Sequence, residues 1–282
     1  MLRLPKFFSR LRHVPPRQRL FQFLNAAIAY PFGGLLRVIH VVEFPKSGGS
    51  WVRNMLQTYL GGRPYLNNRL ITPRTVVQVH RLYHWSLRKA ILVVRDPRDI
   101  YVSMYYFETQ YEHRVRDPKI NQFVSEMPGR PVFDAFADYL EAKLLHVTQP
   151  RFYYSEFLDS WLNRPNTCVI RYEDCLECPE EQLIRMARFV GSSIDLDRVA
   201  HAVSVNSFEH YTKSKSGRSR KRGETDNTQF ARKGIAGDWQ NHFNKKACDL
   251  IEMFEGSSLR RLGYESDRSW IQRHLSNEAS VC

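Results

Sequence analysis

The sequence predicts an α/β fold in which helices cover both faces of a central, mostly parallel sheet. Short apolar runs alternate with helix-like stretches along most of the 282 residues, as expected of a doubly wound sheet. Two runs, 76–80 and 90–95, are almost continuously apolar, which is typical of parallel strands buried on both faces. Polar residues follow these runs directly, so we expect ligands to bind at the carboxyl ends of the strands.

The first strand and the loop after it predict an anion site. The strand, residues 38–44, ends at Pro45, and a helix-like apolar spacing begins near residue 52. Backbone N–H groups at such a helix start favour an anion, and adjacent glycines let the backbone approach it closely. An ordinary strand–turn–helix corner with a surface lysine is the alternative. The residues expected to form the cradle are Lys46, Ser47, Gly48, Gly49 and Ser50.

The order of residues in this cradle excludes a Walker A loop. That motif places its lysine after the last glycine, whereas Lys46 precedes both glycines here. The cradle is therefore expected to hold the 5′ end of a phosphorylated nucleotide in some other way.

The rest of the chain continues the alternation of strands and helices. The second strand ends at His80, and Asp96 and Pro97 are a cap and a first-turn proline for the helix that carries Ser103. A fourth strand is expected at 167–172, and no internal repeat is visible. The further helices are expected around 132–147, around 151–162, from Pro179 to Val190 with Gly191 closing it, over 195–211 in two pieces, and over about 244–262.

The net charge of +13 is concentrated in two segments. Residues 1–42 contain seven Lys or Arg and no acid, and residues 213–233 contain eight against two acids. Such local charge suits nucleic acid, an anionic membrane or an acidic substrate. We divide the chain into a basic N-terminal arm (1–37), one domain (38–264) and a C-terminal tail (265–282). Residues 212–229, rich in Lys, Arg, Ser and Gly, are expected to be a mobile basic loop.

Cellular location is constrained by the arm and by the cysteines. The apolar run 20–36 is shorter than a bilayer span requires, and polar residues interrupt it. The arm is therefore expected to pack on the domain or to lie on an anionic membrane. The five cysteines lack a disulfide spacing, which favours a reducing compartment. We therefore expect a cytoplasmic protein, with membrane association as a further option. The lone Cys175-x-x-Cys178 pair does not make a zinc site, so no metal is expected.

Four blocks stand in order along the chain: Phe44 to Trp51, Arg95 to Ser103, Arg171 to Asp174 and Phe230 to Trp239. Together they resemble the cytosolic-type sulfotransferases that use 3′-phosphoadenosine 5′-phosphosulfate (PAPS). The first block resembles the 5′-phosphosulfate loop, usually written YPKSGTTW, and the second resembles the 3′-phosphate segment. The third resembles the YED block, and the fourth resembles the FxRKGxxGDW block. One block would be weak, but four in order with suitable spacing are strong. The resemblance implies a P-loop-like, three-layer α/β fold.

The resemblance also implies roles for individual residues. The loop 46–51 would hold the 5′-phosphosulfate, and Lys46 would neutralise charge on the leaving phosphate. Trp51 and Phe208 would stack on the adenine, and Tyr172 belongs to the YED block. His80 would be the general base, because a histidine is mostly neutral at pH 7 and able to accept a proton. The residues implied for the 3′-phosphate are Arg95, Ser103, Arg232, Lys233 and the N–H of Gly234.

Three departures from the family pattern stand out. Gly49 and Ser50 replace the two threonines of the loop, so one hydroxyl is lost. Gln78 replaces a lysine often found two residues before the histidine, and it can donate a hydrogen bond but brings no charge. The KxxxTVxxxE dimerisation motif is not evident after Trp239, so the oligomeric state stays unknown.

Two other functions remain as alternatives. One is an ATP-dependent phosphotransferase on a similar sheet, which the missing Walker A order disfavours. The other is a basic nucleic-acid-binding protein, which is disfavoured because aromatic residues do not interleave with the basic runs. The acceptor is expected to be a small molecule, lipid or carbohydrate with a hydroxyl. Several aromatic residues could line its pocket or equally be core: Tyr101, Tyr105, Tyr106, Phe107, Tyr111, Phe152, Tyr153 and Tyr154.

Overall fold

We determined the architecture from a computed structural model. The structure describes residues 24–25, 38–61, 72–84, 87, 89–110, 122–123, 132–146, 150–227 and 229–279. The predicted N-terminal arm, apart from residues 24–25, lies outside this set, as does Tyr111. Within the described part of the chain, no helix is both long and apolar enough to cross a membrane.

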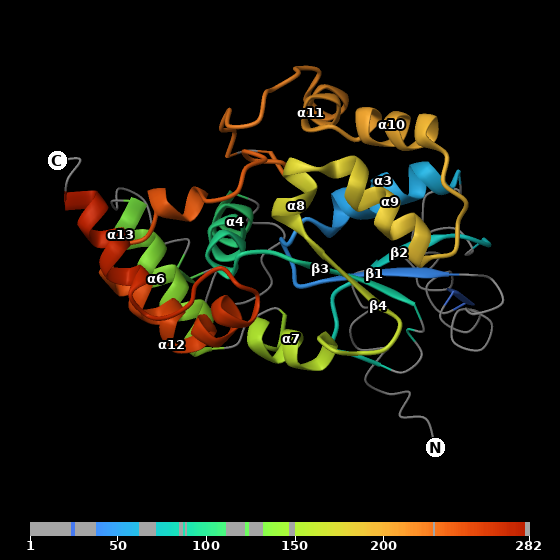
Figure 1. The fold of residues 1–282 in the computed structure, drawn as a ribbon. Helices are drawn as coiled ribbons and strands as arrows, with labels where there is room; N and C mark the ends of the chain where they lie inside the picture. The colour runs from blue at the N-terminus through green and yellow to red at the C-terminus, as the bar shows by residue number, and fades with distance from the viewer. Residues whose placement is uncertain are drawn as a thin grey trace.

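Four parallel strands form the central sheet (Figure 1). Their spatial order is β2-β1-β3-β4, so the first strand lies inside the sheet and every described pair is parallel. The predicted parallel sheet is therefore confirmed. The strands are β1 (Ile39–Glu43), β2 (Val76–Val79), β3 (Ala90–Val94) and β4 (Thr167–Arg171).

The sheet is buried on both faces, which explains why its strands are apolar without interruption. Val42, Leu92 and Val94 belong to one core cluster, while Val41, Ile91 and Val93 belong to the other. Successive strand residues point to opposite faces, so each continuous run supplies both cores at once. The three-layer α/β architecture predicted from the sequence is confirmed.

Helices form the two outer layers (Figure 1). One face is covered by α3 (Gly49–Leu60), α9 (Pro179–Phe189) and α10 (Leu196–Val205). The other face is covered by α4 (Pro97–Gln110), α6 (Val132–Leu145), α7 (Tyr154–Trp161) and α12 (Lys245–Arg261). Two short elements, α8 (Tyr172–Glu177) and the 3₁₀ helix η3 (Asp238–Asn241), precede α9 and α12.

The start of α4 has the predicted form. Pro97 is its first residue, and the Asp96 carboxylate accepts a hydrogen bond of 2.9 Å from the Arg98 N–H. An acid in this position satisfies one of the free N–H groups of the first turn. The N-terminus of α4 therefore follows directly from β3 and places Ser103 two turns along the helix.

The start of the segment 212–229, which the sequence predicts as a mobile loop, is helical. Helix α11 (Phe208–Ser216) covers the first five residues of this segment. Thr212 is buried, and so is Arg220, whose guanidinium donates to the carbonyl oxygens of Glu224, Ala231 and Arg232. These contacts join Arg220 to the backbone of the residues that follow it. They leave no apolar periodicity in the sequence, because backbone carbonyls, and not an apolar face, bind this side chain.

Residues 265–282, predicted as a tail, contain helix α13 (Trp270–Ala279). Trp270 and Ile271 are buried in the core. The Arg98 guanidinium lies over both the Trp239 ring (3.9 Å) and the Trp270 ring (4.9 Å) and pairs with Glu265 at 2.7 Å. Part of the C-terminal segment thus packs into the core, and the domain boundaries given above remain predictions.

Candidate functional site

A cavity of about 440 Å³ lies where the loops after β1, β2 and β3 meet the segments 206–211 and 230–235. Its position at the carboxyl ends of parallel strands is the one expected for a ligand site. Almost all of the predicted site residues line it. These are Lys46, Gly48, Gly49, Ser50, Trp51, His80, Arg95, Ser103, Tyr172, Phe208, Arg232, Lys233 and Gly234. Ser47 is the exception, since it is fully buried and does not line the cavity.

The loop between β1 and α3 is built tightly around its glycines. Gly48 has φ +95°, in the left-handed region, and a Cβ there would overlap the ring of Tyr172. The N–H of Ser47 closes a turn on the Phe44 carbonyl at 3.1 Å. Helix α3 begins at Gly49 without a side-chain cap from Gly48. Its first N–H donates to the Glu43 carboxylate, but the start of the helix lies at the cavity wall, where the positive end of the helix dipole favours an anion.

Lys46 lies between two aromatic rings at the cavity wall. Its Nζ is 4.3 Å from the centre of the Phe107 ring and 4.0 Å from that of Phe230. Burial lowers the pKa of Lys46 to about 7, with Arg95 and Arg232 acting in the same direction and Glu43 opposing them. A bound polyanion would therefore stabilise the charged form of this lysine.

Arg95, at the end of β3, faces the same cavity from the other side. Its guanidinium donates to the carbonyl oxygens of Lys46 (3.3 Å) and Ile235 (3.2 Å) and lies 3.6 Å from Asp99. The ring of Tyr172 lies 4.2 Å beneath it. The Arg95 Nε is buried and has no hydrogen-bond partner among the described residues, so the group can still serve an acceptor atom of a ligand.

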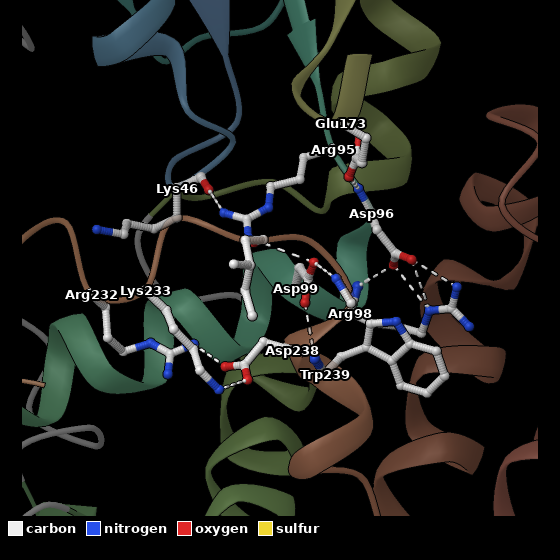
Figure 2. Close-up of polar contacts among 12 residues, drawn as sticks. Lys46, Arg95, Asp96, Arg98, Asp99, Glu173, Arg232, Lys233, Asp238 and Trp239 are labelled. Atoms are coloured by element: carbon white, nitrogen blue, oxygen red, sulfur yellow. Dashed lines mark hydrogen bonds and ion pairs between the residues drawn. The ribbon is translucent and has the colours of Figure 1, made fainter. Parts of the chain in front are cut away.

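Asp238 holds the other two cations of the site, as Figure 2 shows. Its carboxylate pairs with Arg232 and, at 2.5 Å, with Lys233. Burial alone would raise the pKa of Asp238, but its hydrogen bonds to Lys233 and Arg232 hold it below its ordinary value. The carboxylate therefore stays charged and keeps both cations beside the cavity.

Asp99 links this cation cluster to β3. Its two oxygens accept from the backbone N–H groups of Gly237 (2.7 Å) and Trp239 (2.9 Å) (Figure 2). The segment 230–239 lies about 140 residues from Arg95 in the chain, yet these bonds fix one against the other. Cations from two distant blocks thus line the same cavity.

Aromatic side chains line the cavity together with its charged residues. Trp51 meets Tyr172 edge to face at 5.9 Å between ring centres, and the Arg222 guanidinium lies 5.4 Å from the Trp51 ring. Gly234 has φ +67°, and a Cβ there would be 2.5 Å from the ring of Phe208. That glycine is therefore required by both conformation and space. Rings such as these can bind the faces of a planar base.

His80 opens onto the cavity from the end of β2. Its side chain is 42% exposed, and its Nδ1 is 3.2 Å from the backbone carbonyl of Glu43. A carbonyl oxygen only accepts, so the neutral ring carries its proton on Nδ1. Nε2 is then left with a lone pair, which is the arrangement that a general base needs.

Sequence reasoning missed several residues of the cavity wall. Glu43, a buried acid at the end of an apolar strand, was visible as an anomaly because acids are rarely buried without a partner. Phe230 opens a block that was already recognised. Arg222 was assigned only to a charged loop. The other lining residues not named as site residues are Pro45, Asn54, Gln78, Phe107, Leu176, Asn206, Tyr211, Ala231 and Ile235.

The structure decides between pocket and core for several aromatic residues. Tyr101, Tyr105 and Tyr154 are buried in the main core cluster, whereas Phe107 lines the cavity. One side of helix α4 therefore packs mainly into the core, and its other side places Phe107 and Ser103 at the cavity wall. No cluster of three metal-ligating side chains occurs among the residues that the structure describes.

Comparisons with known proteins identify the family. A family model described as "Sulfotransferase domain" matches residues 67–263. Human sulfotransferase 2B1 is 24% identical over 83% of this chain and 65% of its own length, and mouse sulfotransferase 2A1 is 25% identical over 80% of each.

Solved structures share the fold. Mouse sulfotransferase SULT7A1, complexed with PAP, superposes with a TM-score of 0.58 at 20% identity, over 84% of this chain and 88% of that one. Retinol dehydratase, in complex with androsterone and the inactive cofactor PAP, superposes with a TM-score of 0.56 at 16% identity, over 86% of each chain. Since the family model covers well over half of the sequence, this chain belongs to the sulfotransferase domain family and is an enzyme of that family.

Proposed function

We propose that this enzyme transfers the sulfonate group of PAPS to a hydroxyl of a small organic acceptor. The observation that carries the proposal is the set of side chains that line one cavity. Cations, aromatic rings and a histidine with a free lone pair all open onto it. PAPS carries a 3′-phosphate, a 5′-phosphosulfate and a planar adenine on one ribose, and these groups match the cations and the rings.

The nucleotide would be held by the residues that converge on the cavity. Arg95, Arg232 and Lys233 supply positive charge for the 3′-phosphate, and planar arginine suits bidentate phosphate recognition. Ser103 and the N–H of Gly234 would add donors. The unpartnered Nε of Arg95 supports this assignment. Trp51 and Phe208 would contact the adenine. The ring of Tyr172 packs against both Trp51 and Arg95 and would hold them in place. The loop of Lys46 to Ser50 would receive the 5′ end of the nucleotide.

Lys46 and His80 would carry the chemistry. Transfer of a sulfonate resembles phosphoryl transfer, in which positioning and charge stabilisation dominate. Lys46 would neutralise charge that builds on the leaving phosphate, and His80 would accept the proton of the acceptor hydroxyl at Nε2. Removing a preorganised donor typically costs about 10²–10³ in rate, and losing a general base about 10²–10⁴. We expect Lys46→Met and His80→Asn to fall in these ranges.

The acceptor is proposed to be a small apolar molecule. Relatives in the family include a flavonol 4′-sulfotransferase of Flaveria chlorifolia and a 3-beta-hydroxysteroid sulfotransferase of Cavia porcellus. Phe107 and Phe230 supply apolar wall near Lys46 in this chain. We therefore expect phenolic or steroid hydroxyls to be used in preference to carbohydrate hydroxyls.

The first experiment is thermal stabilisation by 3′,5′-adenosine bisphosphate (PAP), beside 5′-AMP and ATP. A ligand that binds only the folded state adds about 2.7 kcal/mol of stability at a hundredfold excess over its Kd. We expect PAP alone to stabilise the protein and Arg95→Ala to abolish the effect. Arg171→Ala is the matched control, since Arg171 ends the neighbouring strand and donates to a carbonyl but does not line the cavity.

The second experiment measures transfer from radiolabelled PAPS to a panel of acceptors. The panel is 4-nitrophenol, a flavonol, a 3β-hydroxysteroid and retinol. In the first experiment, stabilisation by ATP as strong as that by PAP, and unchanged in Arg95→Ala, would favour a phosphotransferase and overturn the proposal.

A further inference from the structure

Glu43 is a buried acid in contact with the proposed reaction centre. It ends β1, is 3% exposed, and lines the cavity. One carboxylate oxygen accepts a hydrogen bond from the N–H of Gly49, and the other accepts from the side-chain amide of Gln78. Both contacts come from donors, so the site accommodates the ionised carboxylate. The same residue is also next to His80, whose Nδ1 is 3.8 Å from its carboxylate oxygen.

This acid explains two of the departures noted in the sequence. A Cβ on Gly49 would be 2.5 Å from the Glu43 Cδ, so a threonine at this position has no room. The φ of Gly49 is not positive, which means that the glycine is required by space and not by backbone conformation. Gln78, in place of a lysine, bridges Glu43 and the Ser50 hydroxyl, which donates to its Oε1 at 3.1 Å. Glu43, Gly49 and Gln78 thus form one unit.

His80 receives two contributions from Glu43. The backbone carbonyl of Glu43 holds the proton on Nδ1 at 3.2 Å, and the carboxylate places a negative charge beside the same edge of the ring. When His80 accepts a proton, the ring becomes a cation, and a nearby carboxylate stabilises that form. A carboxylate that orients a catalytic imidazole and stabilises its charged form is a recurrent arrangement in enzymes.

We propose that Glu43 is the positioning residue of His80, and that Gly49 and Gln78 are the residues that make room for its carboxylate and hold it. The proposal rests on the proposed sulfonate transfer. In that reaction the acceptor oxygen bonds to sulfur as the bond from sulfur to the bridging oxygen of the nucleotide breaks. The hydroxyl proton goes to Nε2 of His80, and Glu43 keeps its charge throughout and takes no proton.

Other charged groups face Glu43 and set its state. Lys46 approaches from the loop and Arg53 from α3, in addition to His80. Burial raises the pKa of Glu43, while His80, the Gly49 N–H, Gln78 and Lys46 act in the opposite direction. The carboxylate is therefore supported from three elements, and its removal is expected to affect His80 most because that ring is the titratable group that must change charge during the reaction.

The test compares wild type, Glu43→Gln and Glu252→Gln. Glu252 is a partly buried acid that pairs with Arg260 and Trp270 away from the cavity, so its variant controls for loss of a carboxylate as such. With PAPS and the best acceptor of the panel, we expect Glu43→Gln to lower kcat by about 10–100-fold, as for carboxylates that orient metal-bound histidines. PAP stabilisation is expected to be retained, so that the loss lies in turnover and not in nucleotide binding.

A second readout does not need turnover. In protein with ¹⁵N-labelled histidine, the His80 signals are assigned by their loss in His80→Asn and followed by NMR against pH. Wild type and Glu252→Gln are expected to show the same His80 signals across the pH series, and Glu43→Gln is expected to differ from both. If Glu43→Gln keeps the wild-type rate and the wild-type His80 signals, the positioning role is refuted. If no protein is stabilised by PAP, the proposed function fails instead, and the NMR comparison still decides the relation between Glu43 and His80.

Discussion

Gly49→Ala gives the sharpest test of the packing beneath the cradle. The new methyl carbon would be 2.5 Å from the Glu43 Cδ, where ordinary contacts are 3.4–4 Å. The Glu43 carboxylate cannot simply withdraw, because Gly49 and Gln78 both donate to it. Overpacking of this kind typically costs about 1–3 kcal/mol. We expect Gly49→Ala to lower the free energy of unfolding by an amount in this range and to reduce PAP affinity, since the loop must shift.

The assay is a double-mutant cycle with Glu43→Ala, which removes the atom that the methyl group meets. Denaturant unfolding of the four proteins gives the coupling energy, and residues in contact couple by about 0.5–3 kcal/mol. We expect Gly49→Ala to cost little in the Glu43→Ala background. Equal costs in both backgrounds, within about 0.5 kcal/mol, would refute the reasoning, because the strain would then come from the backbone and not from Glu43.

Three further predictions concern charge and the C-terminal segment. Burial lowers the pKa of Lys46 to about 7, so at pH 8 most of the free protein lacks this proton. Binding of PAP at pH 8 should therefore be accompanied by uptake of about one proton. Calorimetry in buffers of different ionisation enthalpy measures this proton uptake. The same uptake in Lys46→Met would contradict its assignment to Lys46. Asp238→Asn should destabilise the protein by about 3 kcal/mol at pH 7, because Arg232 and Lys233 lose their partner. The pKa of Asp238 is depressed on folding, so its contribution is present at neutral pH and the difference between variant and wild type should shrink as the pH falls into the acid range; a difference independent of pH would count against the ion pairs. Trp270→Ala should cost about 3–5 kcal/mol in denaturant unfolding but leave PAP affinity unchanged, and full stability of this variant would show that α13 is not part of the core.

The strands and the main motifs were predictable because their signals are local. A parallel strand buried on both faces must be apolar at every position, and the run Ala90–Val94 fulfils this. The cradle was also visible, since a strand, a glycine pair and a helix follow each other within a few residues. Arg95 and Asp96 were predictable for the same reason, because they directly follow a strand and precede a helix.

Two segments were predicted only in part. The two helical pieces expected over 195–211 are α10 and the start of α11, but the end of α11 was assigned to a loop. The segment after α11 is held through Arg220, whose partners are backbone carbonyls that leave no apolar pattern in the sequence. Helix α13 is short and mostly polar, and it is held through Trp270, which packs against Trp239 and Arg98 from far along the chain. Both segments were therefore assigned to loop or tail.

The sequence by itself determined the fold class, the family resemblance and most residues of the cavity, because each of these depends on the order of neighbouring residues. Only the tertiary structure decided how the charges are paired. Asp238 forms ion pairs with Arg232 and Lys233. Glu43 accepts hydrogen bonds from Gly49 and Gln78. The pairing of Glu43 with Gln78 depends on the register that places β1 beside β2. That register is fixed by the packing of the whole sheet, so the partner of a buried acid cannot be read from the residues next to it.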